Sequence, residues 1–120
     1  PLIIADSSQL QQVFINIILN AVDAMRETGT LTLKTFQDDL RNSVYVSISD
    51  TGPGIEDADK TKLFEPFFTT KNVGQGTGLG LSISYSIIQK HHGTIDVQSR
   101  IGEGSTFTVK LPVKREIEND

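Results

Sequence analysis

Apolar residues recur along the chain with two different spacings, which predict two long helices and a set of short strands. Helical spacing runs from Ser7 to Glu27 and again over 79–92, and a shorter helix within 57–66 would end at Pro66. Alternation with a period of two predicts strands in the segments LIIA (2–5), TLTLKTF (30–36), SVYVSISD (43–50), TIDVQS (94–99) and STFTVKLP (105–112). The later strands are close enough in sequence for hairpins. This order predicts an α+β two-layer sandwich, with a mixed, mostly antiparallel sheet and helices on one face.

Capping residues mark the ends of the two long helices. Asp6 is a good N-cap, and Gln9 would complete a capping box. Gly29 would stop the first helix. The second helix should end with Gly93 at its C′ position, where a left-handed backbone favours glycine. Its last turn carries three basic or titratable residues: Lys90, His91 and His92.

The first long helix has an unusual polar stripe on an otherwise apolar cylinder. Spacings of three and four place five polar side chains along one line: Gln9, Gln12, Asn16, Asn20 and Asp23. Asn16 and Asn20 lie mid-helix, where asparagine is unfavourable. The stripe is either a solvated face or the lining of a polar pocket. In a pocket, the amide oxygens would suit a hard cation such as Mg²⁺.

Asp50 is in phase with the apolar face of its predicted strand, on the same side as Val46 and Ile48. A carboxylate there needs hydrogen-bond donors. An exocyclic amino group, as on adenine, would be one such donor, and Gly52 and Gly54 would leave space beside the backbone. Alternatively, Asp50 only begins a turn. Ser105 is in phase with the buried face of the last strand, so it could face Asp50 or be a surface serine.

Glycine occupies every second position from Gly74 to Gly80, directly before the second long helix. The segment has neither the Gly-Lys pair of a Walker A loop nor the spacing of a dinucleotide fingerprint. A flexible lid leading into a helix N-terminus would form a phosphate site, with Lys71 adding a positive charge. A plain flexible linker is the alternative.

Composition narrows the class of protein without naming a function. The 120 residues suit one domain, and the absence of cysteine excludes disulfides and thiolate zinc sites. A net charge of −4 without a basic cluster disfavours nucleic-acid binding. No apolar run is long enough for a membrane span. We therefore expect a cytoplasmic domain without membrane contact of its own, excised from a longer parent that could be membrane-anchored.

Several of these segments together resemble the catalytic and ATP-binding domain of two-component sensor histidine kinases. NIILNAVDA (16–24) is similar to the N box, DTGPGI (50–55) to the G1 box, LFEPFF (63–68) to the F box and GQGTGLGLS (74–82) to the G2 box. Residues 91–112 resemble the closing hairpin of that family, and FEPFFTTK most resembles its nitrogen-regulatory and sporulation-kinase branches. The resemblance implies that residues 1–120 form one domain with the Bergerat ATP-binding fold, shared with gyrase-type ATPases, MutL proteins and heat-shock chaperones.

The resemblance also implies a Mg·ATP site. Asn20 would be the Mg²⁺ ligand with Asn16 beside it, and Asp50 would bind the adenine amino group. Ser105 stands where the family usually has threonine. The implied ATP-binding residues are Asn16, Asn20, Asp50, Gly52, Gly54, Ile55, Lys71, Gly76, Thr77, Gly78, Leu79, Gly80 and Ser105.

Asn16 separates the possible functions, because gyrase-type ATPases carry a glutamate base there and an amide cannot accept that proton. The family's acceptor is a histidine on a separate dimerisation and phosphotransfer domain of the same parent, which passes the phosphoryl group to a response regulator. His91 and His92 would lie about 20 Å from the phosphates, a helix length away. LFEPFF is either a docking surface for that domain or a local core cluster. The alternatives to histidine phosphotransfer are an ATP-driven conformational switch and an anti-sigma-factor-like serine kinase.

Overall fold

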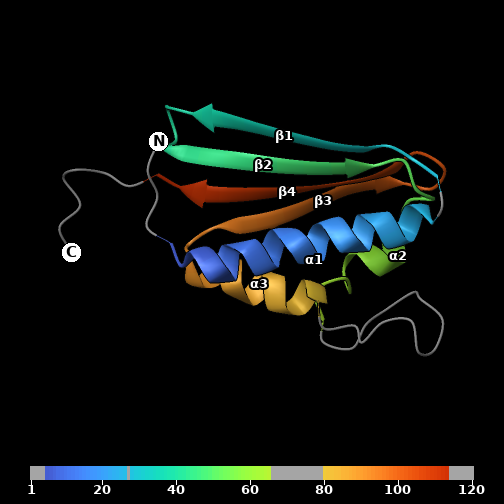
Figure 1. Cartoon of the computed structure of the whole chain (residues 1–120), viewed down its shortest axis with the longest axis horizontal. Helices are drawn as coiled ribbons and strands as arrows, with labels where there is room; N and C mark the ends of the chain where they lie inside the picture. The colour runs from blue at the N-terminus through green and yellow to red at the C-terminus, as the bar shows by residue number, and fades with distance from the viewer. Residues whose placement is uncertain (1–4, 27, 66–79, 114–120) are drawn as a thin grey trace.

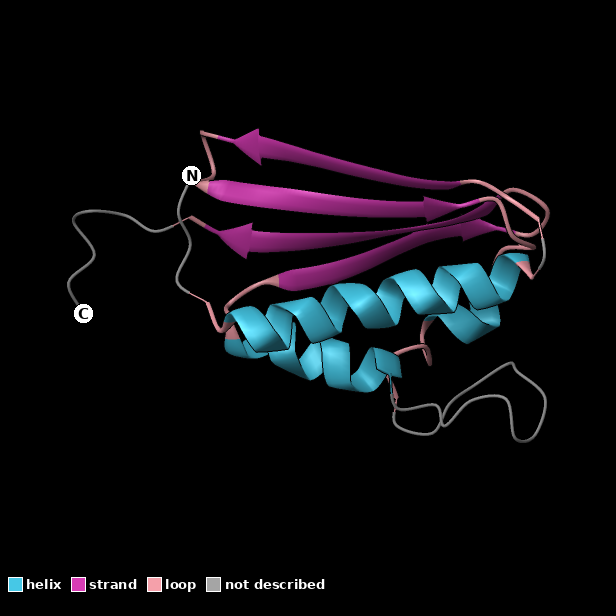
Figure 2. Cartoon of the chain, viewed as in Figure 1, coloured by secondary structure: helices cyan, strands magenta, loops and turns pink. Residues whose placement is uncertain are grey.

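The computed structural model describes residues 5–26, 28–65 and 80–113, which form two layers: a twisted sheet and helices on one of its faces (Figure 1, Figure 2). This confirms the predicted α+β sandwich. The predicted strand at residues 2–5 and the glycine loop fall outside the described residues, except Ala5 and Gly80. In chain order the elements are α1 (Ser7–Met25), β1 (Leu31–Asp38), β2 (Ser43–Asp50), α2 (Asp57–Lys60), α3 (Gly80–Lys90), β3 (Thr94–Arg100) and β4 (Gly104–Pro112).

The sheet joins two hairpins through their later strands. Its order is β1-β2-β4-β3, and within the described chain all three pairings are antiparallel, so the mixed part of the prediction has no counterpart there. Both predicted hairpins are confirmed. Pairing of β2 with β4 places Asp50 opposite Ser105, and pairing of β4 with β3 places Ser105 opposite Ser99. One row across the sheet therefore carries these three polar residues.

The core lies between the helices and the inner face of β2 and β4. The alternating pattern is confirmed here, because Ile48, Phe107, Val109 and Leu111 are buried. α1 and α3 cover this face from the other layer. Their buried apolar residues are Val13, Ile17 and Ala21 of α1 and Ile87 and Ile88 of α3.

The apolar surface of α1 is wider than the core it covers. Ile15, Leu19 and Val22 extend the apolar face of the helix in sequence, yet these side chains are exposed. A single helical stripe contacts the sheet, and α3 occupies the flank beside it. The short helix predicted within 57–66 is also smaller than expected, because α2 covers only Asp57–Lys60.

Asp6 and His91 together cap the beginning of α1. The side chain of Asp6 accepts a hydrogen bond from the backbone N–H of Gln9, at 3.1 Å, which confirms the predicted N-cap. The reciprocal half of the capping box is wrong, since the N–H of Asp6 donates instead to Nε2 of His91, at 3.0 Å. His91 Nδ1 lies 2.8 Å from the carbonyl oxygen of Ile87 and serves as the donor. One imidazole thus connects the end of α3 with the start of α1.

The end of α3 differs by one residue from the prediction. His92, with φ of 62°, takes the left-handed C′ position expected for Gly93. The N–H groups of His92 and Gly93 donate to the carbonyls of Gln89 and Ile88, at 3.0 and 2.9 Å, which is the Schellman pattern. Gly93 is required for a different reason: a β-carbon there would collide with the carbonyl oxygen of Lys110 on β4.

This arrangement predicts opposite effects for two neighbouring substitutions. His92→Gly should raise the free energy of unfolding by about 0.5–1 kcal/mol, because glycine removes the strain of a left-handed histidine. Gly93→Ala should lower it by about 1–3 kcal/mol, because α3 and β4 would be forced apart. Urea denaturation of both variants measures these changes. If His92→Gly instead lowered the free energy of unfolding, His92 would not be a strained left-handed residue; if Gly93→Ala left it unchanged, β4 would not restrict this position.

Candidate functional site

A cavity of about 780 Å³ opens between the C-terminal half of α1, the loop after β2 and the start of β4. Its volume is typical of small-molecule sites. Five of the predicted site residues line it: Asn20, Asp50, Gly54, Ile55 and Ser105. Residues from three distant parts of the sequence therefore meet at one place.

Asp50 closes the buried face of β2, as its phase predicted. It is only 7% exposed, and its Oδ1 accepts a hydrogen bond from the N–H of Gly52, at 2.9 Å. The aspartate therefore begins a turn and also lines the cavity, so both alternatives from the sequence apply. The carboxylate is held in a fixed position, with part of its surface available to a ligand.

The two glycines of the loop after β2 are needed by the protein itself. Gly54 has φ of 84°, and a β-carbon there would collide with the backbone of Arg100. Gly52 packs close to the backbone of Ala24 at the end of α1 and does not line the cavity. Close approach of protein backbone therefore explains both positions, and a role toward a ligand stays a prediction.

Ser99, which the sequence did not lead us to expect, supports the site from behind its lining. It is buried, it pairs with Ser105 in the register of β3 and β4, and its hydroxyl lies 2.8 Å from that of Ser105. A signal for it exists in the sequence. Ser99 follows Ile95 and Val97 at a period of two, just as Asp50 and Ser105 stand in phase with the apolar residues of their own strands.

Asn16 lies beside the cavity rather than in its lining. Its Nδ2 donates to the carbonyl oxygen of Gly80, at 3.3 Å, and to Oγ of Ser84, at 3.4 Å. The polar stripe of α1 thus divides along its length: Asn16 fixes the N-terminus of α3, whereas Asn20 and Asp23 line the cavity. Figure 1 shows α3 beginning beside the middle of α1. Lys71, Gly76, Thr77, Gly78 and Leu79 lie outside the described residues.

The rim of the cavity is acidic. Asp23, Glu56 and Asp59 line it with Asp50, and Arg26 is the one basic side chain among the described lining residues. Nearby, a hydrogen bond from Lys60, together with its charge, lowers the pKa of the exposed Asp57 below its usual range. The rim favours a ligand that brings a cation, or donor groups, with it.

A metal at this site would depend on few protein atoms. Over residues 5–26, 28–65 and 80–113, no three His, Asp or Glu side chains are grouped as metal ligands. Asn20, the predicted Mg²⁺ ligand, lines the cavity, and its amide oxygen is a suitable donor for Mg²⁺, whereas Asn16, predicted beside the ion, does not line the cavity. This donor set fits a Mg²⁺ ion that is held chiefly by water and by a ligand's phosphates.

Phe64 and His91 contribute to the packing of the fold and do not line the cavity. Phe64 packs against Tyr85 and Phe107, with ring centroids 5.2 and 6.5 Å apart, so this part of LFEPFF belongs to the core. Phe67 and Phe68 lie outside the described residues. Both ring nitrogens of His91 are occupied at the far end of α3, a helix of 11 residues, or about 16 Å, from Gly80.

The fold and this cavity agree with one known family. Residues 5–115 match the histidine kinase-, DNA gyrase B- and HSP90-like ATPases, and the chain belongs to this family. Within it, the similar proteins are sensor kinases, which confirms the resemblance to histidine kinase catalytic domains. The chain is 46% identical to sensor kinase CckA of Brucella abortus (strain 2308), over 90% of this chain and 13% of that protein. It is 42% identical to sporulation kinase E of Bacillus subtilis (strain 168), over 98% of this chain and 16% of that protein.

Solved structures support the same assignment. The catalytic domain of histidine kinase ThkA superposes with a TM-score of 0.80 at 40% identity, over 92% of this chain and 70% of that one. Full-length ShkA in complex with AMPPNP superposes with a TM-score of 0.81 at 33% identity, over 92% of this chain and 22% of that one. The chain is thus the catalytic domain of a protein-histidine kinase.

The described helices include none that is both long and apolar enough to cross a membrane.

The contacts of Asn16 predict that a carboxylate cannot replace its amide without loss of stability. Asn16→Asp would place an acceptor against the Gly80 carbonyl, which has no proton to donate, so the free energy of unfolding should fall by about 1–3 kcal/mol. Asn20→Asp is the matched control on the same stripe and should change stability less. Urea denaturation without nucleotide compares the two, and equal losses would show that the Asn16 contacts do not hold α3.

Proposed function

We propose that this chain binds Mg·ATP in the cavity and transfers the γ-phosphoryl group to a histidine on a separate domain of its parent protein, within a two-component system. The observation that carries the proposal is the buried carboxylate of Asp50 in a nucleotide-sized cavity, with an amide at Asn16 instead of a carboxylate. The carboxylate of Asp50 would bind the purine base of the nucleotide. The amide of Asn16 cannot accept a proton, which argues against activation of water for hydrolysis.

Asp50 would recognise the adenine ring. A buried carboxylate gains most from a donor that it can reach without water, and an exocyclic amine is such a donor. Ile55 and Leu63 would supply apolar contact beside it. AMPPNP in the similar structure of ShkA supports an adenine nucleotide as the ligand.

Asn20, which lines the cavity, would hold Mg²⁺ through its amide oxygen. When bound, the ion would offset the negative charge of the phosphates, which the acidic rim would otherwise repel. Gly80 begins α3, whose first N–H groups suit a phosphate. Lys71 and the glycine loop 74–80 would complete the phosphate site.

Transfer to an outside nucleophile fits the site better than hydrolysis. An amide at Asn16 cannot take a proton from water, and both of its hydrogens point toward α3. His91 is bonded at the other end of that helix. The acceptor would therefore be a histidine on a dimerisation and phosphotransfer domain, with a response regulator downstream. We place residues 1–120 as one cytoplasmic domain of such a parent, in keeping with the small share of CckA and sporulation kinase E that the chain spans.

Replacing Asp50 tests the adenine contact. Asp50→Asn keeps the shape but exchanges a charged acceptor for a neutral amide, so affinity for a non-hydrolysable ATP analogue with Mg²⁺ should fall by more than about fivefold. Isothermal calorimetry measures the affinity, and circular dichroism checks that the variant is folded. Unchanged affinity in a folded variant would show that Asp50 does not bind the adenine ring.

A labelling experiment tests phosphotransfer itself. The chain is incubated with γ-labelled ATP, alone and with the separately produced phosphoacceptor domain of its parent. Acid-labile label should appear on that domain only, because the chain holds the nucleotide but contributes no acceptor. Rapid phosphate release by the chain alone would favour the conformational ATPase, and acid-stable label on an added protein would favour a serine kinase.

A further inference from the structure

We propose that Ser99 fixes the direction of the Ser105 hydroxyl, so that the polar floor of the cavity offers acceptors only and selects a 6-amino purine over a 6-oxo purine. The proposal rests on the nucleotide function above and adds a residue that determines its specificity. Ser99 is a positioning residue here, because it acts on the ligand through Ser105.

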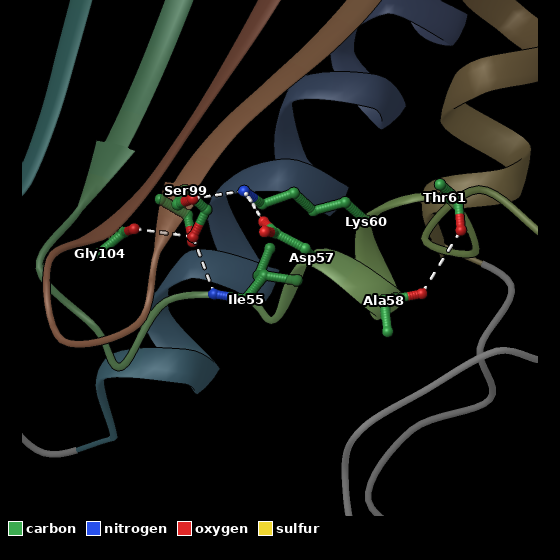
Figure 3. Close-up of polar contacts among 8 residues, drawn as sticks. Ile55, Asp57, Ala58, Lys60, Thr61, Ser99 and Gly104 are labelled. Carbon is green, nitrogen blue, oxygen red and sulfur yellow. Dashed lines mark hydrogen bonds and ion pairs between the residues drawn. The ribbon is translucent and has the colours of Figure 1, made fainter.

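The Ser99 hydroxyl makes three contacts in a buried setting. It accepts from the N–H of Ile55 at 2.8 Å and donates to the carbonyl oxygen of Gly104 at 2.8 Å (Figure 3). Its oxygen also lies 2.8 Å from Oγ of Ser105. A serine hydroxyl has one proton and two lone pairs. The carbonyl can only accept and the amide can only donate.

These contacts leave one arrangement for the pair of serines. The single proton of Ser99 goes to Gly104, and one of its lone pairs is taken by Ile55. Its remaining lone pair must receive the proton of Ser105. Ser105 is then a donor to Ser99 and can only accept from a ligand in the cavity.

The register places this acceptor beside another. Ser105 pairs with Asp50 across β2 and β4, both are 7% exposed, and both line the cavity. An ionised carboxylate also only accepts. A ligand edge with an amino group satisfies such a floor directly or through a water. A carbonyl in the same place would oppose two acceptors and leave buried oxygens without donors.

The surrounding structure holds Ser99 in place. Lys60 of α2 donates to the Ser99 carbonyl oxygen and also pairs with Asp57, at 2.8 Å (Figure 3). Together with the bonds to Ile55 and Gly104, these contacts connect α2, the loop after β2 and the β3–β4 turn to Ser99. This rigidity is what allows a hydroxyl, which otherwise rotates, to determine specificity.

ADP and IDP provide the test, because they carry the same phosphates and differ in the 6-position group, amino or oxo, and in the proton that the 6-oxo base carries on N1. Their affinities for the 120-residue chain are measured by calorimetry with Mg²⁺, and the ratio of the two is compared between variants. Ser99→Ala frees the Ser105 proton to face the ligand, so the preference for ADP should fall by about fivefold or more, the worth of one hydrogen bond. Ser99→Thr keeps the hydroxyl and should restore the preference.

A second background separates positioning from a general effect on the fold. In Ser105→Ala, the added Ser99→Ala change should leave the ADP to IDP ratio as it is, because the proton it controls is gone. Ser49→Ala is the matched control: it removes a hydroxyl pair with Thr106, at 2.9 Å, in the adjacent row of β2 and β4 and outside the cavity lining. It should not change the ratio. If Ser99→Ala does not fold, Ser99→Cys, with its weak hydrogen bonds, replaces it.

Two results would overturn the proposal while leaving the nucleotide function intact. One is an unchanged ratio in a folded Ser99→Ala or Ser99→Cys variant that still binds ADP. The other is an equal fall in the ratio when Ser105 is already alanine. If the unsubstituted chain binds neither ADP nor IDP, the proposed function is wrong, and the proposal for Ser99 is wrong as well.

Discussion

The structure depends on a carboxylate placed at the end of a buried sheet face. Burial of Asp50 is unfavourable unless donors surround it, and the protein meets this requirement with the Gly52 N–H. That contact turns the chain sharply after β2. The turn brings Gly52 against Ala24 of α1, and beyond it Gly54 and Ile55 line the cavity together with Asp50. The hydrogen bond that satisfies Asp50 thus forms at the edge of the site.

The row Asp50, Ser105 and Ser99 extends this constraint across the sheet. On each of β2, β3 and β4, the inward-facing apolar residues are followed by one inward-facing polar residue. These three polar residues are neighbours in the strand register. The inner layer is therefore apolar in the middle and polar at one end. Helices cover the apolar part. Beside the polar part, the loop after β2 packs against the β3–β4 turn, through the hydrogen bond to Ser99 and the close contact of Gly54. Core and site are two regions of one surface.

Local patterns predicted the elements well, because periodicity records which side of a strand or helix is buried. The two hairpins, the N-cap at Asp6 and the inward direction of Asp50 all follow from spacing of this kind. Contacts between distant segments could not be predicted in that way. The bond from Asp6 to His91 replaces half of a local capping box, and Gly93 is small because β4 passes close to it. The phase of Ser99 with Ile95 and Val97 did indicate an inward side chain, but its contacts with Ile55, Gly104 and Ser105 could not be predicted from that spacing.

Asn16 shows how one side chain can serve the fold and restrict the chemistry together. Its amide donates to two oxygens at the start of α3, one of them on Ser84, which itself donates to the Gly80 carbonyl. A carboxylate at this position could act as a base toward water, but it could not donate to either oxygen. The contact between α1 and α3 therefore depends on this amide, which also cannot act as a base at this position. The start of α3, where phosphates would bind in the proposed function, is positioned by the residue that would also leave a nearby water unactivated.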